Sequence, residues 1–137
     1  MAGIAGVVAG AVLFSGTPAP TAHPMWSPWS EQAVASARQS GRPVLVDFSA
    51  AWCVTCLVNE RVALHSPQVQ ARLEKDRVVT LKGDWTNPDP AITAALHQYG
   101  QDGVPLYLLI ARDGQVTVLP QILTPGIVIA ALAKIEG

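Results

Sequence analysis

The residues with the clearest chemical potential are two cysteines, Cys53 and Cys56, in the stretch AWCVTCLVNE. Thiols at this spacing serve as a structural disulfide, as half of a metal site, or as a dithiol that is oxidised and reduced during function. A link closing so short a loop removes little unfolded-state entropy, so the structural use is weak. A structural zinc site usually adds a second CxxC or two histidines. His23, His65 and His97 lie in unrelated segments, so we expect no metal.

The position of the pair favours the redox use. PVLVDFSA (43–50) is a continuous apolar run with β-branched residues, which is typical of a strand buried on both faces. The next helix should begin near Cys53, where free backbone N–H groups and the helix dipole favour a thiolate. Cys56 lies one turn further on, close enough to form a disulfide with its neighbour. Exchange would then proceed by thiolate attack and a mixed disulfide that the second cysteine resolves.

Two acidic residues and one tryptophan lie close to the pair in sequence. Asp47 interrupts the apolar strand, where a charge is costly, so we predict a functional role; the alternative is a carboxylate satisfied by backbone donors at a strand end. Glu60 follows the second cysteine by one helical turn and the first by two, so all three share a helix face. It either acts on the thiols or is a solvated residue paired with Arg61 or Lys82. Trp52 either flanks the site or simply packs.

The elements that position these residues follow from turn, cap and periodicity signals. Helices are expected from Glu31 to Gly41, from Cys53, from Pro67, from Pro90 to Gly100 and from Pro125; strands are expected over 43–50, 77–85, 106–111 and 116–119. The first two strands are separated by helical residues, so they must be parallel, whereas the last two form an antiparallel hairpin around Asp113-Gly114. The sequence therefore predicts an α/β fold, with a small mixed sheet and helices on both faces.

Apolar residues at helical spacing indicate which side of each helix packs. In the helix after Cys53 the stripe consists of Val54, Leu57, Val58 and Val62. In the later helices the inward residues are expected to be Ile92, Ala95, Leu96 and Tyr99, and then Ile127, Val128, Ala131, Leu132 and Ile135.

Length and charge limit the range of functions. The 137 residues suit one domain, only 14% are charged against a usual ~25%, and the net charge is −1. No basic footprint for nucleic acid is present, so we expect a monomeric domain that meets its partners through an apolar or neutral surface.

Residues 1–25 form a separate apolar and Pro-rich segment, and the domain is expected to span 26–137. The apolar run from Ala2 to Phe14 is shorter than the ~20 residues of a spanning helix. It has the length of a signal-peptide core, with Ala19 and Ala22 near a cleavage site, although a positively charged start is missing. It also suits the end of a membrane helix or a disordered tail.

Several segments together resemble a known family. VLVDFSAAWCVTC and a later GVP are similar to the thioredoxin superfamily. Within it, the chain resembles the C-terminal periplasmic domain of the DsbD family of thiol:disulfide interchange proteins in four segments, AAWCVTCLVNE, SPQVQARL, KGDWTNPDPAITAAL and GVPLYLLI. The resemblance covers residues 29–136, and its motifs are specific.

The resemblance implies a thioredoxin-like fold and an electron-relay function. The domain would accept electrons from a membrane-embedded domain and pass them to a periplasmic N-terminal domain of the same family, whose disulfide it would reduce, with no cofactor beyond its own dithiol. Cys53 would be the attacking thiol and Cys56 the resolving thiol. Asp47 and Glu60 match acidic positions that tune the first thiol, and Val104-Pro105 matches a cis-proline position that faces the dithiol. The domain would lie on the periplasmic side of the bacterial inner membrane, as part of a larger membrane protein.

Two departures and two rival functions accompany this interpretation. Val54-Thr55 stands between the cysteines in place of the Gly-Pro of thioredoxin or the Pro-His of the oxidant DsbA, which argues against an oxidase. Leu57 stands where many relatives carry a charge, so the partner surface is expected to differ. The rivals are a free-standing thioredoxin-like reductase, for example in cytochrome maturation, and a non-catalytic thioredoxin-fold binding module.

Overall fold

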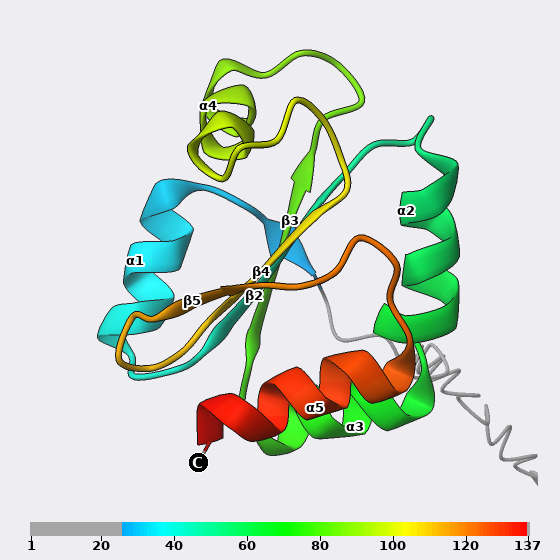
Figure 1. The fold of residues 1–137 in the computed structure, drawn as a ribbon. Coiled ribbons are helices and arrows are strands. Elements are labelled where there is room, and N and C mark those ends of the chain that lie inside the picture. Colours follow the sequence, from blue (N-terminus) through cyan, green and yellow to red (C-terminus); the bar gives the residue numbers. More distant parts are fainter. Residues whose placement is uncertain (1–25, 137) are drawn as a thin grey trace, which may run out of the picture.

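A computed structural model of the chain describes residues 26–136 (Figure 1). The expectations for residues 1–25 lie outside this range. The elements are β1 (Ser27–Pro28), α1 (Glu31–Gln39), β2 (Val44–Ser49), α2 (Val54–Asn59), a π-helical turn η1 (Glu60–Leu64), α3 (Pro67–Lys75), β3 (Val79–Asp84), α4 (Pro90–Gln98), β4 (Leu106–Ile110), β5 (Val116–Val118) and α5 (Pro125–Glu136). The predicted α/β class and the predicted order of the longer elements are confirmed.

The five strands form one mixed sheet in the order β1-β3-β2-β4-β5. β2 pairs parallel with β3 and antiparallel with β4, while β4 and β5 form the predicted hairpin. The short β1, which the sequence analysis did not predict, pairs parallel with β3 at the other edge. In the middle of the sheet, Asp47 of β2 lies between Lys82 of β3 and Tyr107 of β4 in the strand register.

The helices cover the two faces of the sheet separately. Figure 1 shows α1 and α4 on one face and α2, α3 and α5 on the other. Because side chains alternate along a strand, β2 contributes Val44, Val46 and Phe48 to the core under α1 and α4. It contributes Leu45 to the core under α3, α5 and η1. Asp47 has the same parity as Leu45, so its carboxyl group points toward the face that α2 covers.

Side chains cap the starts of α1, α3 and α4. Ser30, Ser66 and Asp89 each accept a hydrogen bond from the backbone N–H three residues later, at 2.9, 3.3 and 3.1 Å. These bonds satisfy donors that a helix start leaves unpaired. Within the part of the chain described, no helix has both the length and the apolar character needed to cross a membrane.

The predicted packing stripe of the helix after Cys53 is wrong. Val54, Leu57, Val58 and Val62 are 72, 46, 52 and 49% exposed. The buried side of α2 and η1 instead consists of Cys56, Asn59, Glu60, Ala63 and Leu64. Periodicity misled because the two polar residues on that side, Asn59 and Glu60, have specific partners in Tyr107 and Lys82, which makes their burial possible.

Candidate functional site

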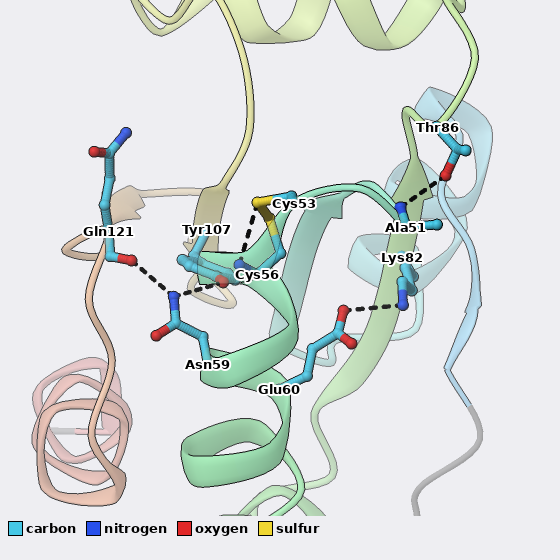
Figure 2. Close-up of a disulfide and its surroundings, with 9 residues drawn as sticks. All are labelled: Ala51, Cys53, Cys56, Asn59, Glu60, Lys82, Thr86, Tyr107 and Gln121. Carbon is cyan, nitrogen blue, oxygen red and sulfur yellow. Dashed lines mark hydrogen bonds and ion pairs between the residues drawn. A yellow bond between two sulfur atoms is a disulfide. The ribbon is translucent and has the colours of Figure 1, made fainter.

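The two cysteines form a disulfide at the N-terminus of α2 (Figure 2). Cys53 is the N-cap residue, and its Sγ accepts a hydrogen bond of 3.2 Å from the backbone N–H of Cys56. Cys53 is 7% exposed and Cys56 is fully buried. The sulfur that a partner reaches first is therefore that of Cys53, and its position at the helix start favours a thiolate there after reduction.

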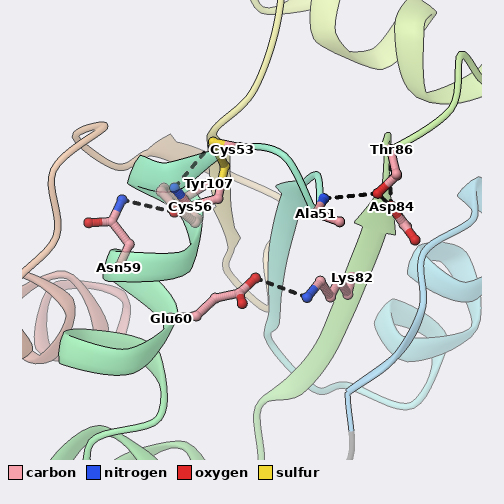
Figure 3. Close-up of polar contacts among 9 residues, drawn as sticks. All are labelled: Ala51, Cys53, Cys56, Asn59, Glu60, Lys82, Asp84, Thr86 and Tyr107. Atoms are coloured by element: carbon pink, nitrogen blue, oxygen red, sulfur yellow. Dashed lines mark hydrogen bonds and ion pairs between the residues drawn. A yellow bond between two sulfur atoms is a disulfide. The ribbon is translucent and has the colours of Figure 1, made fainter.

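The loop before the disulfide is held by one threonine. The backbone N–H of Ala51 donates to Thr86 Oγ1 at 2.9 Å (Figure 3). Trp52 Nε1–H donates to the Thr86 carbonyl at 3.2 Å. Thr86 is itself bonded to the carboxylate of Asp84. Trp52 is 58% exposed, and its ring lies 6.1 Å from that of Trp85, so it borders the disulfide loop and also packs against a neighbouring ring.

On the other side of the disulfide lies the segment before β4. The Val104–Pro105 peptide bond is cis, as the resemblance implies. Val104 packs against the small apolar cluster of Ala50, Cys53 and Cys56. The structure thus brings Trp52 and Val104, which are far apart in sequence, to the same dithiol.

The two predicted acids meet beneath α2, together with a lysine. Glu60 Oε1 lies 2.9 Å from Lys82 Nζ, so the pairing with Lys82 is found and Glu60 is not a solvated residue (Figures 2 and 3). Asp47 is 2% exposed, and its Oδ1 has no hydrogen-bond partner within the described chain. A carboxyl group in such a place is costly to ionise.

The electrostatics divide the two acids into different roles. Burial, together with the negative charge of Glu60 and hydrogen bonding with it, raises the pKa of Asp47 well above its usual range. Burial alone would also raise the pKa of Glu60, but the bonded ammonium of Lys82 and the hydrogen bond with Asp47 outweigh it and lower that pKa. Glu60 is therefore the ionised partner of Lys82, and Asp47 holds its proton to higher pH.

A buried asparagine, which the sequence analysis did not single out, fixes α2 to the rest of the domain. Asn59 Nδ2–H groups donate to Tyr107 Oη at 2.9 Å and to the Gln121 carbonyl at 2.7 Å (Figure 2). Asn59 Oδ1 accepts from the backbone N–H of Leu123 at 3.0 Å. The only signal in the sequence was a residue of low helix propensity inside a helix.

No group of three or more His, Cys, Asp or Glu side chains is placed to hold a metal ion within residues 26–136. The chemistry visible at this site is that of the disulfide itself. It can be opened by a thiolate and closed again without any further group.

The chain belongs to the thioredoxin-like family, whose model matches residues 25–111. Among individual proteins, it is similar to the thiol:disulfide interchange protein DsbD 1 of Pseudomonas aeruginosa, with 44% identity over 84 residues, which is 61% of this chain and 14% of that relative. DsbD 2 of the same organism is 33% identical over 104 residues, 72% of this chain and 17% of that relative. The chain thus spans about a sixth or less of these curated relatives.

Solved structures agree on the fold. The oxidised C-terminal domain of Neisseria meningitidis DsbD matches with a TM-score of 0.60 at 23% identity, over 82% of this chain and 97% of that one. A thioredoxin from Thermus thermophilus matches with a TM-score of 0.63 at 22% identity, over 81% and 85% of the two chains. The chain is therefore a thioredoxin-like domain that carries a Cys53–Cys56 disulfide and is similar to part of the DsbD thiol:disulfide interchange proteins, as the resemblance implied.

Proposed function

We propose that this domain is an electron relay. It accepts two electrons from a dithiol of a membrane-embedded partner and passes them to a disulfide of a periplasmic partner domain. The observation that carries the proposal is the position of the Cys53–Cys56 disulfide at the start of α2, with Cys53 outermost. The similarity to thiol:disulfide interchange proteins supports it.

The uptake of electrons begins with the disulfide closed. A thiolate of the donor attacks Cys53 Sγ, the bond to Cys56 breaks, and Cys56 leaves as a thiolate that takes up a proton. The second thiol of the donor, after losing its proton, then attacks the donor sulfur of the mixed disulfide and releases Cys53. The donor leaves as a disulfide, and the domain holds the two electrons as a dithiol.

The delivery of electrons runs the same steps toward the acceptor. The Cys53 thiolate attacks one sulfur of the acceptor disulfide, and the other acceptor sulfur leaves as a thiolate. Cys56 loses its proton and attacks Cys53 Sγ, which restores the disulfide and frees the acceptor as a dithiol. In this proposal Cys53 is the attacking thiol, Cys56 resolves, and the buried pair of Asp47 and Glu60 tunes the thiols from beneath.

The surroundings of the reaction are part of the proposal. Residues 26–137 form a monomeric thioredoxin-like domain on the periplasmic side of the bacterial inner membrane, within a larger membrane protein. The reaction uses the dithiol and no other cofactor. Trp52 and Val104-Pro105 flank the sulfur that reacts and contact the partner there.

The order of the two thiols can be tested by trapping. With Cys56→Ser the mixed disulfide cannot be resolved, so the variant should accumulate a covalent complex with an oxidised partner. The purified N-terminal domain of Pseudomonas aeruginosa DsbD 1 serves as that partner, and non-reducing gels show the complex. Cys53→Ser should trap little, because its remaining thiol is fully buried. Equal trapping by both variants, or by neither, would disprove the assignment.

A further inference from the structure

The outer side of α2 and η1 carries an apolar surface that the fold does not use. We define the outer stripe as Trp52, Val54, Leu57, Val58 and Val62, which are 46–72% exposed. Positions 54, 58 and 62 follow one another at a spacing of four, so the stripe runs along one side of the helix for more than two turns. Such a contiguous apolar surface is a candidate for contact with another molecule.

Charge is nearly absent from this surface. Between residues 52 and 64 the charged side chains are Glu60 and Arg61. Glu60 points inward to Lys82, which leaves Arg61 as the exposed charge of the segment. A surface hollow of about 420 Å³, lined by Leu57, Glu60, Arg61 and His65, opens beside the stripe.

The stripe is continuous with the reacting sulfur. Trp52 and Val54 directly flank Cys53, which any thiol–disulfide partner must reach to within bonding distance. A partner domain that covers Cys53 therefore covers the upper end of the stripe, and a slight extension of the contact along α2 buries Leu57 and Val58. Of the other exposed large apolar residues, Val116 and Val118 belong to β5, and Ile122 belongs to the loop that is bonded to Asn59 of α2 through Gln121 and Leu123.

We infer that the outer stripe is the docking surface for the thiol–disulfide partner domain, and that the surface around this partner's own cysteines is apolar and uncharged. The inference rests on the proposed function and adds the chemistry of the partner. Apolar contact along two helical turns holds the complex while the sulfurs exchange, and it does so independently of ionic strength.

The test compares the rate of reaction with a protein disulfide and the rate with a small-molecule disulfide. The reduced full chain is mixed with the oxidised N-terminal domain of Pseudomonas aeruginosa DsbD 1 or with oxidised glutathione, and stopped-flow tryptophan fluorescence gives both rate constants. Val58→Lys and Val62→Lys place a charge on the stripe away from the sulfurs. Val118→Lys on β5 is the matched control, because Val118 is 48% exposed and Val62 is 49% exposed.

We expect each stripe variant to react about tenfold more slowly with the protein domain, because a lysine must be desolvated in the contact. The rates with glutathione, and all rates of Val118→Lys, should stay within about twofold of the parent. Circular dichroism confirms that the variants fold.

Other results separate the failures. A parent that reduces glutathione but not the domain refutes the proposed relay. If the parent reduces the domain, two results refute the docking surface alone. In the first, the stripe variants react with the domain as fast as Val118→Lys does. In the second, they are slowed as much toward glutathione as toward the domain. Self-association of the parent that Val62→Lys abolishes would assign the stripe to a second copy. If a chain starting at Trp26 reacts faster with the domain than the full chain does, and the same truncation brings no gain in Val62→Lys, the stripe would be assigned to residues 1–25.

Discussion

Replacing Asn59 with alanine should destabilise the domain more than any exposed substitution in α2. The side chain of Asn59 makes three hydrogen bonds, to Tyr107 Oη, to the Gln121 carbonyl and from the Leu123 N–H. Together they join α2 to β4 and to the loop before α5. Asn59→Ala removes all three, and the groups left behind determine the cost.

The magnitude follows from the burial of those groups. Tyr107 and Leu123 are 0 and 3% exposed, so the Tyr107 hydroxyl and the Leu123 N–H lose a partner that water cannot replace. Each buried unsatisfied group costs about 1–3 kcal/mol, whereas the exposed Gln121 carbonyl can rehydrate. We therefore expect a loss of about 2–5 kcal/mol in the free energy of unfolding. For a domain of this size that corresponds to a fall in Tm of about 10–20 °C.

Urea unfolding of the oxidised protein, followed by tryptophan fluorescence and by circular dichroism, measures the effect. Tyr107→Phe keeps the Asn59 bonds to Gln121 and Leu123 and should cost about 1 kcal/mol. The double variant should cost less than the sum of the two single variants, because they share one bond. Gln121→Ala, which keeps its backbone carbonyl, is the control and should stay within about 0.5 kcal/mol of the parent. An Asn59→Ala protein as stable as this control would refute the reasoning.

Two further predictions concern β2 and its neighbour. The pKa of Asp47 is raised in the folded protein by burial and by Glu60, so stability is lost as pH rises from the unfolded value near ~3.9 through the folded one. Asp47→Asn should therefore raise the urea midpoint at neutral pH and flatten the pH dependence of that midpoint. It should increase the alkylation rate of Cys53 only at pH values where Asp47 is ionised. An unchanged pH profile of the urea midpoint would contradict this. Gly83→Ala places a Cβ into the Phe48 ring and should lower the free energy of unfolding by about 1–3 kcal/mol. Gly126→Ala is the control and should leave it unchanged, because the nearest side-chain atom that its Cβ would meet is Thr124 Oγ1 at 3.9 Å. Equal urea midpoints for the two variants would show that the Phe48 ring moves aside.

Much of the fold was predictable because its signals are local. The caps at Ser30, Ser66 and Asp89 mark helix starts, and the apolar run 43–50 marks the central strand. β1 could not be predicted, because a strand of two residues is defined only by its pairing with β3. The π-helical turn η1 includes a backbone bond of 2.8 Å from the His65 N–H to the Glu60 carbonyl, and this wider backbone spacing leaves no sequence signal.

The site was predictable in its sulfurs and acids but not in its supports. The spacing of Cys53 and Cys56 and the charge of Asp47 inside an apolar strand are visible in the sequence. Thr86 and Asn59 act through contacts with residues 35 and 48 or more positions away, so only the folded chain shows them. The functional roles of the acids remain predictions that Asp47→Asn tests.

The one wrong prediction, the packing side of α2, has a physical origin that also bears on function. A helix normally buries its apolar side, and α2 instead buries Asn59 and Glu60 while it exposes Val54 and Val58. The inward polar groups have specific partners in Tyr107 and Lys82, which fix the helix in one position against the sheet and so hold the disulfide at its N-terminus in place. Because these polar contacts already fix α2 against the sheet, its apolar side is available to another molecule. Local rules fail most often where a protein serves function rather than its own stability, and here they fail on the helix that carries the reactive cysteines.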